Sequence, residues 1–408
     1  MKENIVIVGG GAAGMIAAIV ARRNGGHVTL LEKNDRLGKK LLATGNGRCN
    51  YTNINLSSTN YHGENPKFTY SALESFNVDR TMDFFEILGI TPFVEDGGKV
   101  FPMSLQSSSV LDVLRLEIEY LGIEIKLESD VKNISKKKEF ILELENGEKI
   151  KASKVIIATG GMAMPASGSD GSGYALVEEL GHTIVETFPG LVQLKLEGNI
   201  FKNLKGVKFP GRVKLLSKDK LIIEDFGDVL FTDYGISGPP ILQISRTAIK
   251  YLKDKQEIKL SVSIIDSKSK EELYDYLDAR FISMKNRTIE EALIGLINKR
   301  LIPTVLKEIG IKKDKRVTSI SKKEIRDIAR ILTQWEFKIS GSKGWKDAQV
   351  TAGGVSTGEV DNKTMESKKC PGLYLVGEIL DIDGDCGGFN LQWAWSSGYI
   401  AGMNSSGK

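Results

Sequence analysis

Residues 5–32 read IVIVGGGAAGMIAAIVARRNGGHVTLLE, and this stretch decides the fold. Two short apolar runs flank a glycine turn and an alanine-rich segment, which is the order of a strand, a turn, a helix and a second strand. Gly9, Gly11 and Gly14 have the spacing G-x-G-x-x-G. In such units the first glycine makes a tight turn, the second lets a pyrophosphate approach the backbone, and the third lets the helix pack closely on the strand. The stretch therefore predicts a β-α-β unit that binds a dinucleotide.

Glu32 ends the second apolar run and follows Gly14 at the distance typical of the acid in these units. An acid at this position binds ribose hydroxyls and disfavours a 2′-phosphate, so NAD or FAD is expected rather than NADP. Gly10 and Ala13 complete the turn, where backbone N–H groups and the helix dipole attract phosphate. The alternative is a β-α-β unit without a ligand, and the placement of the acid argues against it.

The composition is that of a globular chain, and its 408 residues are enough for two or three domains. The 56 basic and 52 acidic residues leave a net charge of +4. The lysine runs at 136–138 and 312–313 lack interleaved aromatic residues, so no nucleic-acid partner is expected. No apolar run approaches the roughly 20 residues of a membrane span. The first strand starts too early for a signal peptide, and we expect a cytoplasmic location.

Cysteine and histidine are too scarce for a disulfide framework or a metal site. The chain has three of each, with no C-x-x-C pair and no histidines at ligand spacing. No metal is therefore expected. His62 is interpreted as a histidine in a surface loop, although its imidazole could titrate near neutral pH.

The first half of the chain continues with α/β elements. A polar, glycine-punctuated segment at 33–53 is long enough to be a functional loop. The pattern then predicts amphipathic helices near 70–88 and 108–121. A strand pair is predicted at 123–127 and 140–144.

The run VIIATGG at 155–161 predicts a buried strand that stops abruptly in glycines. Ligands of doubly wound sheets lie at the carboxyl ends of the strands, so Thr159, Gly160 and Gly161 are expected to face the cofactor. A strand that ends in an ordinary turn is the alternative. A further helix is expected within GSDGSGYALVEELGH at 168–182.

The pattern of apolar and polar residues changes at Leu191. Short alternating runs, among them DVLFTDYGISGPPILQIS at 228–245, predict an antiparallel sheet or barrel up to about residue 265. From 268 to 335 the pattern becomes helical, with apolar residues every four positions from Leu273. We interpret this region as an insertion that covers a cofactor and shapes a substrate pocket.

The glycine-rich α/β texture returns near residue 349. A strand expected at 373–376 ends in Gly377 and Glu378, and a helix of small residues closes the chain. Both chain ends thus build one α/β, Rossmann-like cofactor domain, with an inserted antiparallel, barrel-like β domain and a small helical subdomain. The expected bounds are 1–190 and 349–408 for the cofactor domain, 191–266 with about 336–348 for the β domain, and 267–335 for the helical subdomain.

Three sequence blocks carry a resemblance to a known family. TGNGRCN at 44–50, FTDYGISGP at 231–239 and GEILDIDGDCGGFNLQWAWSSG at 377–398 stand in the order seen in FAD-binding flavoproteins of the two-dinucleotide-binding-domain superfamily. Within that superfamily they resemble the BaiN-type family, which includes proteins called aminoacetone oxidase-like. The resemblance covers nearly the whole chain and implies that the cofactor is FAD.

The resemblance also implies a set of cofactor contacts. Glu32 would bind the adenosine ribose, and Glu378, which follows Gly377, would approach the ribityl and pyrophosphate groups; many relatives outside this family carry aspartate at that position. Residues along the diphosphate and the flavin would be Lys33, Lys40, Thr44, Gly45, Gly47, Arg48, Cys49 and Asn50. Asp130 and Val131 would reach the adenine through backbone groups, and Gly388, Phe389, Asn390 and Leu391 would lie at the pyrimidine edge of the isoalloxazine.

The last placement agrees with electrostatics. Reduced flavin carries negative charge near N1 and C2=O, and a helix that begins at Gly387 or Gly388 would direct N–H donors and a positive dipole there. A flexible glycine loop is the alternative. The strand end at Glu378, just before these glycines, favours the cofactor site.

The sequence favours flavin redox chemistry. It shows no Ser/His/Asp set, and a second G-x-G-x-x-G is absent, so a separate NAD(P)H domain is not expected. Either NADH or NADPH docks transiently and the electrons reduce a small molecule such as a conjugated enone, or an amine is oxidised and oxygen takes the electrons. The family resemblance permits both, and we favour the reductase. A non-catalytic FAD sensor and an RNA-modifying flavoprotein are alternatives of another class, and the oligomeric state stays open.

No catalytic acid is assigned from the sequence. Arg48 could neutralise a phosphate or a flavin anion. Cys49 and Cys386 fall in flavin-facing blocks and could be redox-active, although a small apolar filler is the preferred interpretation. Tyr234 could donate a proton to a substrate, although a packed turn aromatic is preferred.

Overall fold

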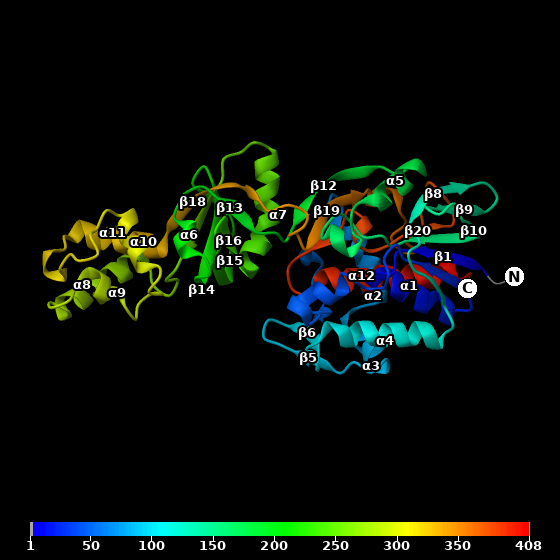
Figure 1. Ribbon diagram of the computed structural model, residues 1–408, viewed down its shortest axis with the longest axis horizontal. Helices are drawn as coiled ribbons and strands as arrows, with labels where there is room; N and C mark the ends of the chain where they lie inside the picture. Colours follow the sequence, from blue (N-terminus) through cyan, green and yellow to red (C-terminus); the bar gives the residue numbers. More distant parts are fainter. Residues whose placement is uncertain (1–2, 408) are drawn as a thin grey trace. The chain divides into compact units, whose positions relative to one another are not determined.

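The computed structural model describes residues 3–407, which form two compact units (Figure 1). The first unit is built from both chain ends, up to Gly190 and from Trp345 onward, and the second spans Leu191–Gly344. Each unit has its own cluster of buried apolar residues. The two ends of the chain therefore share one core, and the middle of the chain has another.

A five-stranded parallel sheet forms the centre of the first unit, in the order β20-β11-β1-β2-β7. The strands are β1 (Asn4–Val8), β2 (His27–Leu31), β7 (Glu124–Lys126), β11 (Lys154–Ile157) and β20 (Leu373–Leu375). The central strand β1 is buried from Ile5 to Val8, as its continuous apolar run predicts. Because β20 comes from the end of the chain and pairs with β11, the sheet is complete only when both chain ends fold together.

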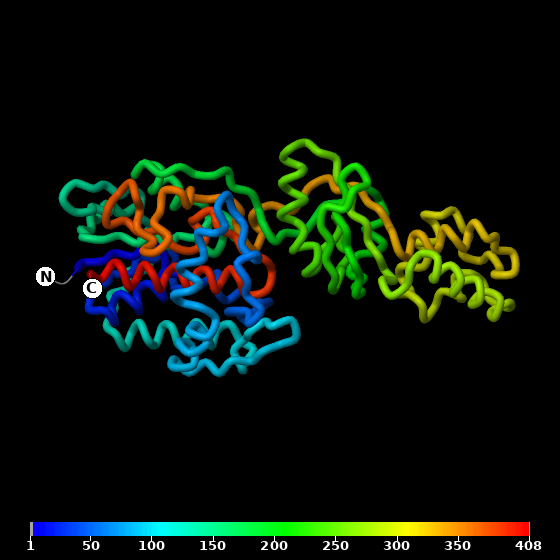
Figure 2. Tube along the Cα trace, turned by 180° about the vertical axis from the view of Figure 1, so that it is seen from behind, coloured from blue at the N-terminus to red at the C-terminus, as the bar shows by residue number. Residues whose placement is uncertain are grey.

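Two helices from opposite ends of the chain pack side by side against this sheet. These are α1 (Ala12–Arg23) and α12 (Phe389–Ser405), seen in blue and red in Figure 2. A methyl group added at Gly398 would lie 2.4 Å from the Ala13 carbonyl oxygen, and one at Gly402 would lie 2.8 Å from that of Ala17. The glycines of α12 therefore allow its backbone to approach α1 closely.

Smaller elements surround the parallel sheet. The remaining helices of the first unit are α2 (Tyr70–Ser75), α3 (Val78–Ile87), α4 (Ser107–Tyr120) and α5 (Ser172–Glu179). The antiparallel sheets are β10-β9-β8 (Lys149–Ala152, Phe140–Leu144, Val131–Lys136), β12-β19 (Ile184–Gly190, Val350–Val355), β3-β6-β5 (Thr52–Asn53, Lys99–Pro102, Pro92–Val94) and β21-β4 (Asp383–Gly384, Tyr61–His62).

Two predictions for the first unit are wrong in detail. The helix expected at 70–88 is interrupted, because the Asn77 side chain accepts the Arg80 N–H and caps a new helix. The strands expected at 123–127 and 140–144 do not pair with each other. Instead β7 joins β2 in the parallel sheet, whereas β9 lies between its sequence neighbours β8 and β10. Strand periodicity identifies strands but not their partners.

The second unit contains a closed antiparallel barrel in the order β13-β16-β15-β14-β17-β18. Its strands are β13 (Leu194–Leu196), β14 (Lys208–Ser217), β15 (Lys220–Phe231), β16 (Gly235–Ser237), β17 (Lys259–Ser263) and β18 (Trp335–Ser342). Alternate residues of β14 are buried, which is the pattern of a barrel wall. The Rossmann-like fold with an inserted barrel that the sequence predicts is therefore confirmed.

Helices complete the second unit. They are α6 (Phe201–Leu204), α7 (Pro239–Lys253), α8 (Lys270–Ser283), α9 (Ile289–Leu293), α10 (Ile302–Glu308) and α11 (Lys322–Thr333). Leu273 and Leu277 of α8 are fully buried, as their spacing predicts. The β pattern expected through 228–245 is wrong after Ser237, because α7 starts at Pro239. Proline has the backbone angle of a first helical turn and lacks the N–H that a strand would need.

Candidate functional site

The glycine turn after β1 has one open position and two closed ones. A methyl group added at Gly9 would lie 2.5 Å from the Ala158 carbonyl oxygen, and one at Gly14 would lie 1.9 Å from the Gly9 carbonyl oxygen. At Gly11 no atom of the described residues would lie within 4 Å. The chain itself therefore requires Gly9 and Gly14. Gly11, at the N-terminus of α1, leaves space for a ligand.

Glu32 is nearly buried at the edge of this turn. Its Oε2 accepts the Gly10 N–H at 2.9 Å, and its Oε1 accepts the backbone and side-chain N–H groups of Asn34 at 2.8 and 2.6 Å. The Glu32 carbonyl oxygen also accepts the Ser129 N–H at 2.9 Å, which brings the segment with Asp130 and Val131 next to the carboxylate. The residues predicted to bind the adenosine half thus lie together. Asn34 was not predicted.

A second group of predicted residues meets at the carboxyl end of β11. The Thr351 hydroxyl accepts the Met162 N–H at 2.7 Å, next to Gly161. Glu378 accepts the Thr351 N–H at 2.9 Å with one carboxylate oxygen and pairs with Lys40 Nζ at 2.6 Å with the other. Lys40 and Glu378 are both about one-fifth exposed. Four distant segments therefore converge here, and Thr351 is the member that sequence reasoning missed.

Three of the buried polar atoms that lack a hydrogen-bond partner among residues 3–407 belong to the predicted cofactor region. They are Thr159 Oγ1, Ser169 Oγ and Asn50 Oδ1. Thr159 and Ser169 flank Gly160, and Asn50 Oδ1 would lie 2.9 Å from a methyl group added at Gly388. Buried polar groups normally have partners. All three are adjacent to predicted cofactor contacts, so these orphaned atoms and the open position at Gly11 fit a bound dinucleotide.

The TGNGRCN segment forms an irregular 3-10 turn (Leu41–Gly47) in which Gly45 has a φ of 57°. Cys49 is fully buried, and burial raises the pKa of its thiol to about 12, against a lowering by the Thr44 hydrogen bond. A thiol with this pKa is neutral at physiological pH. The environment supports the interpretation of Cys49 as an apolar filler.

Two predicted cations of this region pair with carboxylates of the chain. Arg48 donates to Glu95 at 2.6 Å and lies over the Phe101 ring at 4.3 Å. Lys33 pairs with Asp170 at 2.7 Å. All four charged side chains are at least one-fifth exposed, so these pairs are weak and exchangeable. Cofactor contacts by Arg48 and Lys33 stay predictions.

The N-terminus of α12 is held by side chains that the sequence did not single out. Asn53 Nδ2 donates to the Gly387 carbonyl at 2.9 Å. The buried Gln392 accepts the Thr52 hydroxyl at 2.6 Å and donates to the Thr81 hydroxyl at 2.8 Å. Gly388 has a φ of 103°. These bonds fix the first turn of α12, whose free N–H groups are the predicted contacts for the flavin pyrimidine edge.

The Asn390 side chain, in the first turn of α12, stabilises the turn that precedes this helix. Its side chain accepts the Gly384 N–H and donates to the Gly384 carbonyl, both at 2.8 Å. Phe389 is buried and Leu391 partly buried in the core of the first unit. The chain therefore uses these three side chains for its own structure, and their backbone groups are the parts left to contact a cofactor.

His62 is not the surface-loop histidine that the sequence suggested. It lies in β4, opposite Asp383 of β21, and its Nε2 is 2.7 Å from Asp385 Oδ1. The loop-like composition around His62 predicts a solvent-exposed side chain. The sequence does not reveal the pairing, because the partner strand comes from the other end of the chain.

The other weak candidates have different surroundings. Cys386 is partly exposed in the turn before α12. Tyr234 lies in the second unit, between β15 and β16, with Lys343 Nζ 4.9 Å from its ring centre. A lysine over the ring fits the interpretation of Tyr234 as a packed turn aromatic.

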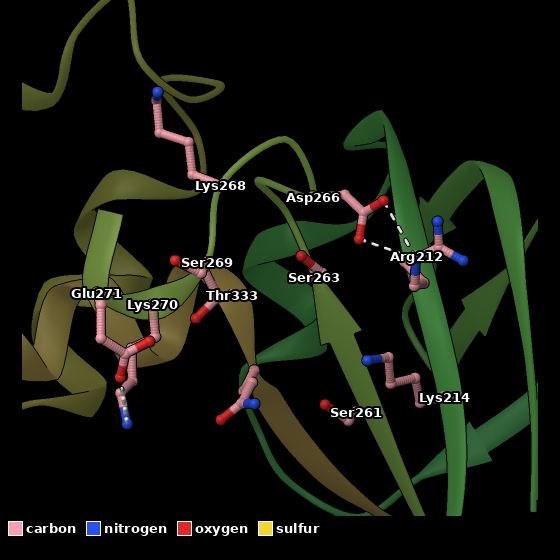
Figure 3. Close-up of a pocket in the computed structure, with 11 residues that line it drawn as sticks. Arg212, Lys214, Ser261, Ser263, Asp266, Lys268, Ser269, Lys270, Glu271 and Thr333 are labelled. Carbon is pink, nitrogen blue, oxygen red and sulfur yellow. Dashed lines mark hydrogen bonds and ion pairs between the residues drawn. The ribbon is translucent and has the colours of Figure 1, made fainter. Parts of the chain in front are cut away.

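The second unit has a cavity of its own, of about 360 Å³ (Figure 3). It lies between the barrel and the start of α8, and Arg212 on its wall forms an ion pair with Asp266 at 3.0 Å. Lysine, serine and acidic side chains line the rest: Lys214, Ser261, Ser263, Lys268 and Glu271. None of the predicted cofactor contacts lines this cavity.

The part of the chain that the structure describes contains neither a metal-binding cluster nor a membrane-spanning helix. Between residues 3 and 407, no group of three or more histidine, cysteine, aspartate or glutamate side chains is arranged to hold a metal ion. None of the helices in that range has the length and apolar character needed to cross a membrane.

Comparisons with known proteins cover nearly the whole chain. Residues 3–404 match the family described as HI0933-like protein Rossmann domain. A 3-dehydro-bile acid delta(4,6)-reductase of Clostridium scindens is 39% identical over 98% of both chains. A ribosomal RNA dihydrouridine synthase of Haemophilus influenzae is 31% identical over 99% of this chain and 98% of its own.

Among solved structures, a 3-ketosteroid-delta4-(5alpha)-dehydrogenase from Rhodococcus jostii covers 100% of this chain and 97% of its own, with a TM-score of 0.51 and 13% identity. At this level of identity the likeness concerns the fold alone.

Proposed function

This chain belongs to the HI0933-like family and is an FAD-dependent oxidoreductase, and we propose that it reduces a carbon–carbon double bond conjugated to a carbonyl group in a small organic substrate. The observation that carries the proposal is the 39% identity, over 98% of both chains, to a protein named as a delta(4,6)-reductase. The electrons would come from NADH or NADPH. Substrate and electron donor are both part of the proposal.

A second group of relatives supports the same reaction type. Dihydrouridine differs from uridine by two hydrogens across a ring double bond that is conjugated to a carbonyl. The names of the 39% and 31% identical relatives thus both describe chemistry at a double bond next to a carbonyl group. The family resemblance to amine oxidases has no comparable support among these relatives, so the reductase is favoured over the oxygen-dependent amine oxidase.

The residues of the first unit suit the binding of FAD. The N-terminus of α1 at Gly11 would receive the diphosphate, and Glu32 would accept hydrogen bonds from the ribose hydroxyls. The pair formed by Lys40 and Glu378 would lie near the ribityl chain, where Lys40 adds a positive charge. Asn50 Oδ1, which lies beside Gly388, is a buried acceptor with no donor among the described residues.

FAD, when bound, supplies the two-electron chemistry, which transfers a hydride to the substrate. The chain provides the electrostatic setting for it. The N–H groups at the start of α12 and the helix dipole would stabilise negative charge on the reduced ring. Gln392 and Asn53 hold this helix start in place before the cofactor arrives, so little reorganisation is needed.

Reduced nicotinamide would dock without a domain of its own. Within the described residues, only one parallel sheet is followed by a glycine turn of the G-x-G-x-x-G type. It is the sheet that contains β1. A transient complex over the flavin is the arrangement that remains for a nicotinamide donor.

The experiment separates the two halves of the reaction. Purified protein with bound FAD is mixed anaerobically with NADH or NADPH, and the reduced protein is then mixed with 2-cyclohexenone, a steroid 4-en-3-one or a steroid 4,6-dien-3-one. We expect loss of the oxidised-flavin absorbance in the first step and its return in the second, with a saturated product. Reduction of the flavin by primary amines, with return only after oxygen is added, would favour the amine oxidase instead.

Reduction of a uracil base in RNA is a second candidate, and the 31% identity to a ribosomal RNA dihydrouridine synthase favours it. An RNA substrate would make binding strongly salt-dependent, because phosphate contacts release counterions. Reduced enzyme is therefore also mixed with ribosomal RNA at about 50 and 200 mM salt. Reoxidation by RNA that weakens steeply with salt, and none by the enones, would favour this candidate. A protein that binds FAD and turns over no donor would be a sensor.

A further inference from the structure

We propose that His62 donates the proton that accompanies hydride transfer to the substrate, and that Asp385 positions its imidazole. This inference deepens the proposed function and rests on it, because a proton is needed at one carbon of the double bond when hydride reaches the other. Asp385 is a positioning residue in this proposal, since it acts through His62.

The pair of His62 and Asp385 has the geometry of an oriented acid–base group. His62 Nε2 lies 2.7 Å from Asp385 Oδ1. The second carboxylate oxygen accepts the Asn60 side-chain amide at 3.0 Å, and the Asp385 N–H donates to the Asn60 carbonyl at 2.9 Å. Both carboxylate oxygens are thus engaged, so the carboxylate holds one orientation of the ring.

The ring of His62 keeps one nitrogen available. The side chain is 35% exposed, whereas that of Asp385 is 16% exposed. Nδ1 of His62 makes no hydrogen bond with the residues that the structure describes. With Nε2–H donating to Asp385, Nδ1 carries the second proton of the imidazolium and can pass it to a substrate.

The pair is attached directly to the helix start that is proposed to receive the flavin. Strand β4 pairs with β21, which places Tyr61 opposite Gly384. The Tyr61 hydroxyl donates to the Phe389 carbonyl at 3.0 Å, in the first turn of α12. Asn390 Nδ2 is 3.2 Å from the Asp385 carbonyl. His62 is therefore linked to the start of α12 through its neighbour Tyr61 and its partner Asp385.

Carboxylates lie on the two segments that carry and face β4, and Lys67 is the cation on the short helix Pro66–Thr69, which also contacts β4. Glu64 follows on its own segment, and Asp381, Asp383 and Asp385 come from the facing segment. The Glu64 N–H donates to Asp381 at 2.8 Å. Four carboxylates and one ammonium group therefore lie on these segments, so the charge around His62 is negative.

The step balances with the donor already named. A reduced nicotinamide dinucleotide supplies two electrons and one hydrogen as hydride, which reaches the β-carbon of the conjugated double bond through the flavin. The His62 imidazolium supplies a proton to the α-carbon. The π bond is lost, two C–H bonds form, and solvent returns a proton to the exposed ring of His62.

The kinetic test compares the variants His62→Gln and Asp385→Asn with the control His27→Gln. His27 is exposed at the start of β2 and is not a predicted contact. We expect His62→Gln to slow flavin reoxidation by an enone roughly 10²- to 10⁴-fold, the usual contribution of general acid–base catalysis. Flavin reduction by NAD(P)H should stay within about twofold, because it needs no proton from His62.

Two outcomes of this test would overturn the proposal. One is loss of bound FAD, or equal slowing of both half-reactions, in His62→Gln while His27→Gln behaves as wild type, since either result indicates a structural role. The other is an unchanged rate of reoxidation. Asp385→Asn should give a smaller loss than His62→Gln, because the ring is present but less well oriented.

A second measurement needs no substrate. The chain has three histidines, so ¹⁵N-histidine spectra of the protein with bound FAD are readily assigned with the His62 and His27 variants. Reduction by dithionite adds negative charge at the flavin, and the His62 resonances should move while those of His27 stay. Unmoved His62 resonances would overturn the placement. If no enone reoxidises the wild-type protein, the proposed function fails, and this spectrum alone decides whether His62 lies beside the cofactor.

Discussion

Cys49 and Cys386 lie in the two sequence blocks predicted to face the flavin, but their environments differ. Cys49 is fully buried, and burial raises the pKa of its thiol to about 12. Cys370 is also buried, and burial raises the pKa of its thiol as well. Cys386 is partly exposed. Reactivity of a cysteine depends on its thiolate fraction and on access, so the three thiols should be distinguishable.

We predict that iodoacetamide at about pH 8 alkylates Cys386 in the native protein within minutes and spares Cys49 and Cys370 until the chain unfolds. Peptide mass spectrometry of native and urea-treated samples measures this. Cys386→Ala serves as the control, which should leave the native protein unmodified. Rapid native alkylation of Cys49 would contradict its assignment as a neutral filler.

The β-α-β unit contains two glycines with different surroundings, Gly14 and Gly11. Gly14 is required by the chain, because a methyl group there would meet the Gly9 carbonyl oxygen at 1.9 Å. Gly11 has a φ of −81° and no neighbour within 4 Å of an added methyl group. The sequence pattern assigns different roles to the two glycines, and only Gly14 is explained by packing within the chain.

The variants Gly11→Ala and Gly14→Ala should therefore behave differently. We expect Gly11→Ala to fold with a melting temperature near that of the wild type in the absence of FAD, but to bind FAD at least about tenfold more weakly, because the methyl group occupies ligand space. Gly14→Ala should lower the melting temperature of the FAD-free protein itself. Calorimetry and FAD fluorescence titration check both. Normal FAD affinity in Gly11→Ala would contradict the placement of the diphosphate.

A buried histidine, His182, joins the segment after α5 to the segment 359–367. His182 Nδ1 is 3.2 Å from Glu359, and its Nε2 is 2.8 Å from the Ser367 hydroxyl. Burial lowers the pKa of His182 below 6.5, although Glu359 opposes this. Burial would raise the pKa of Glu359, but bonds from Lys369 and the Thr183 N–H lower it to about 2. The segment is thus held by a neutral imidazole and a charged carboxylate.

Both shifts predict a loss of stability in acid. The unfolded chain takes up a proton on His182 before the folded protein does, so its contribution is full above pH 6.5 and is lost as pH falls below that value. The contribution of Glu359 to stability is lost at lower pH, as pH falls from about 4.5 towards 2. His182→Gln should therefore show a shallower decline of melting temperature between about pH 7.5 and 5.5 than the wild type. Parallel curves would contradict a buried neutral His182.

At the scale of the whole molecule, the chain has two cores and one cofactor site is proposed in the first. The second unit begins and ends on adjacent strands, since the Lys343 N–H donates to the Gln193 carbonyl at 2.9 Å. In the first unit, Gly190 pairs with Val350 across β12 and β19. An insertion whose ends lie close together can be removed without separating the elements that it joins.

We predict that replacing residues 192–343 with a short glycine-serine linker leaves a protein that folds and binds FAD. FAD should raise the melting temperature of this shortened protein, because the ligand binds only the folded state. The isolated segment 191–344 should fold with a melting temperature that FAD does not change. Failure of the shortened protein to bind FAD would show that the second unit supplies necessary contacts.

Much of the architecture follows from local sequence signals. The glycine spacing at 9–14 and the apolar run of β1 identify the β-α-β unit, and alternation identifies the barrel strands. These signals depend on residues a few positions apart, so they determined the fold class and a dinucleotide site. The resemblance of three sequence blocks to a flavoprotein family indicated the family and FAD. The division of the inserted region into a β domain and a helical subdomain stays a prediction.

Tertiary structure alone decided which of these elements meet. It placed β7 beside β2 and brought Thr351 to Glu378. It also brought His62 to Asp385, 323 positions away, and so changed a loop histidine into the partner of a carboxylate at the start of α12. No local pattern encodes such pairs, because they depend on long-range backbone pairing and on which polar groups are left buried after the two chain ends have folded into one core.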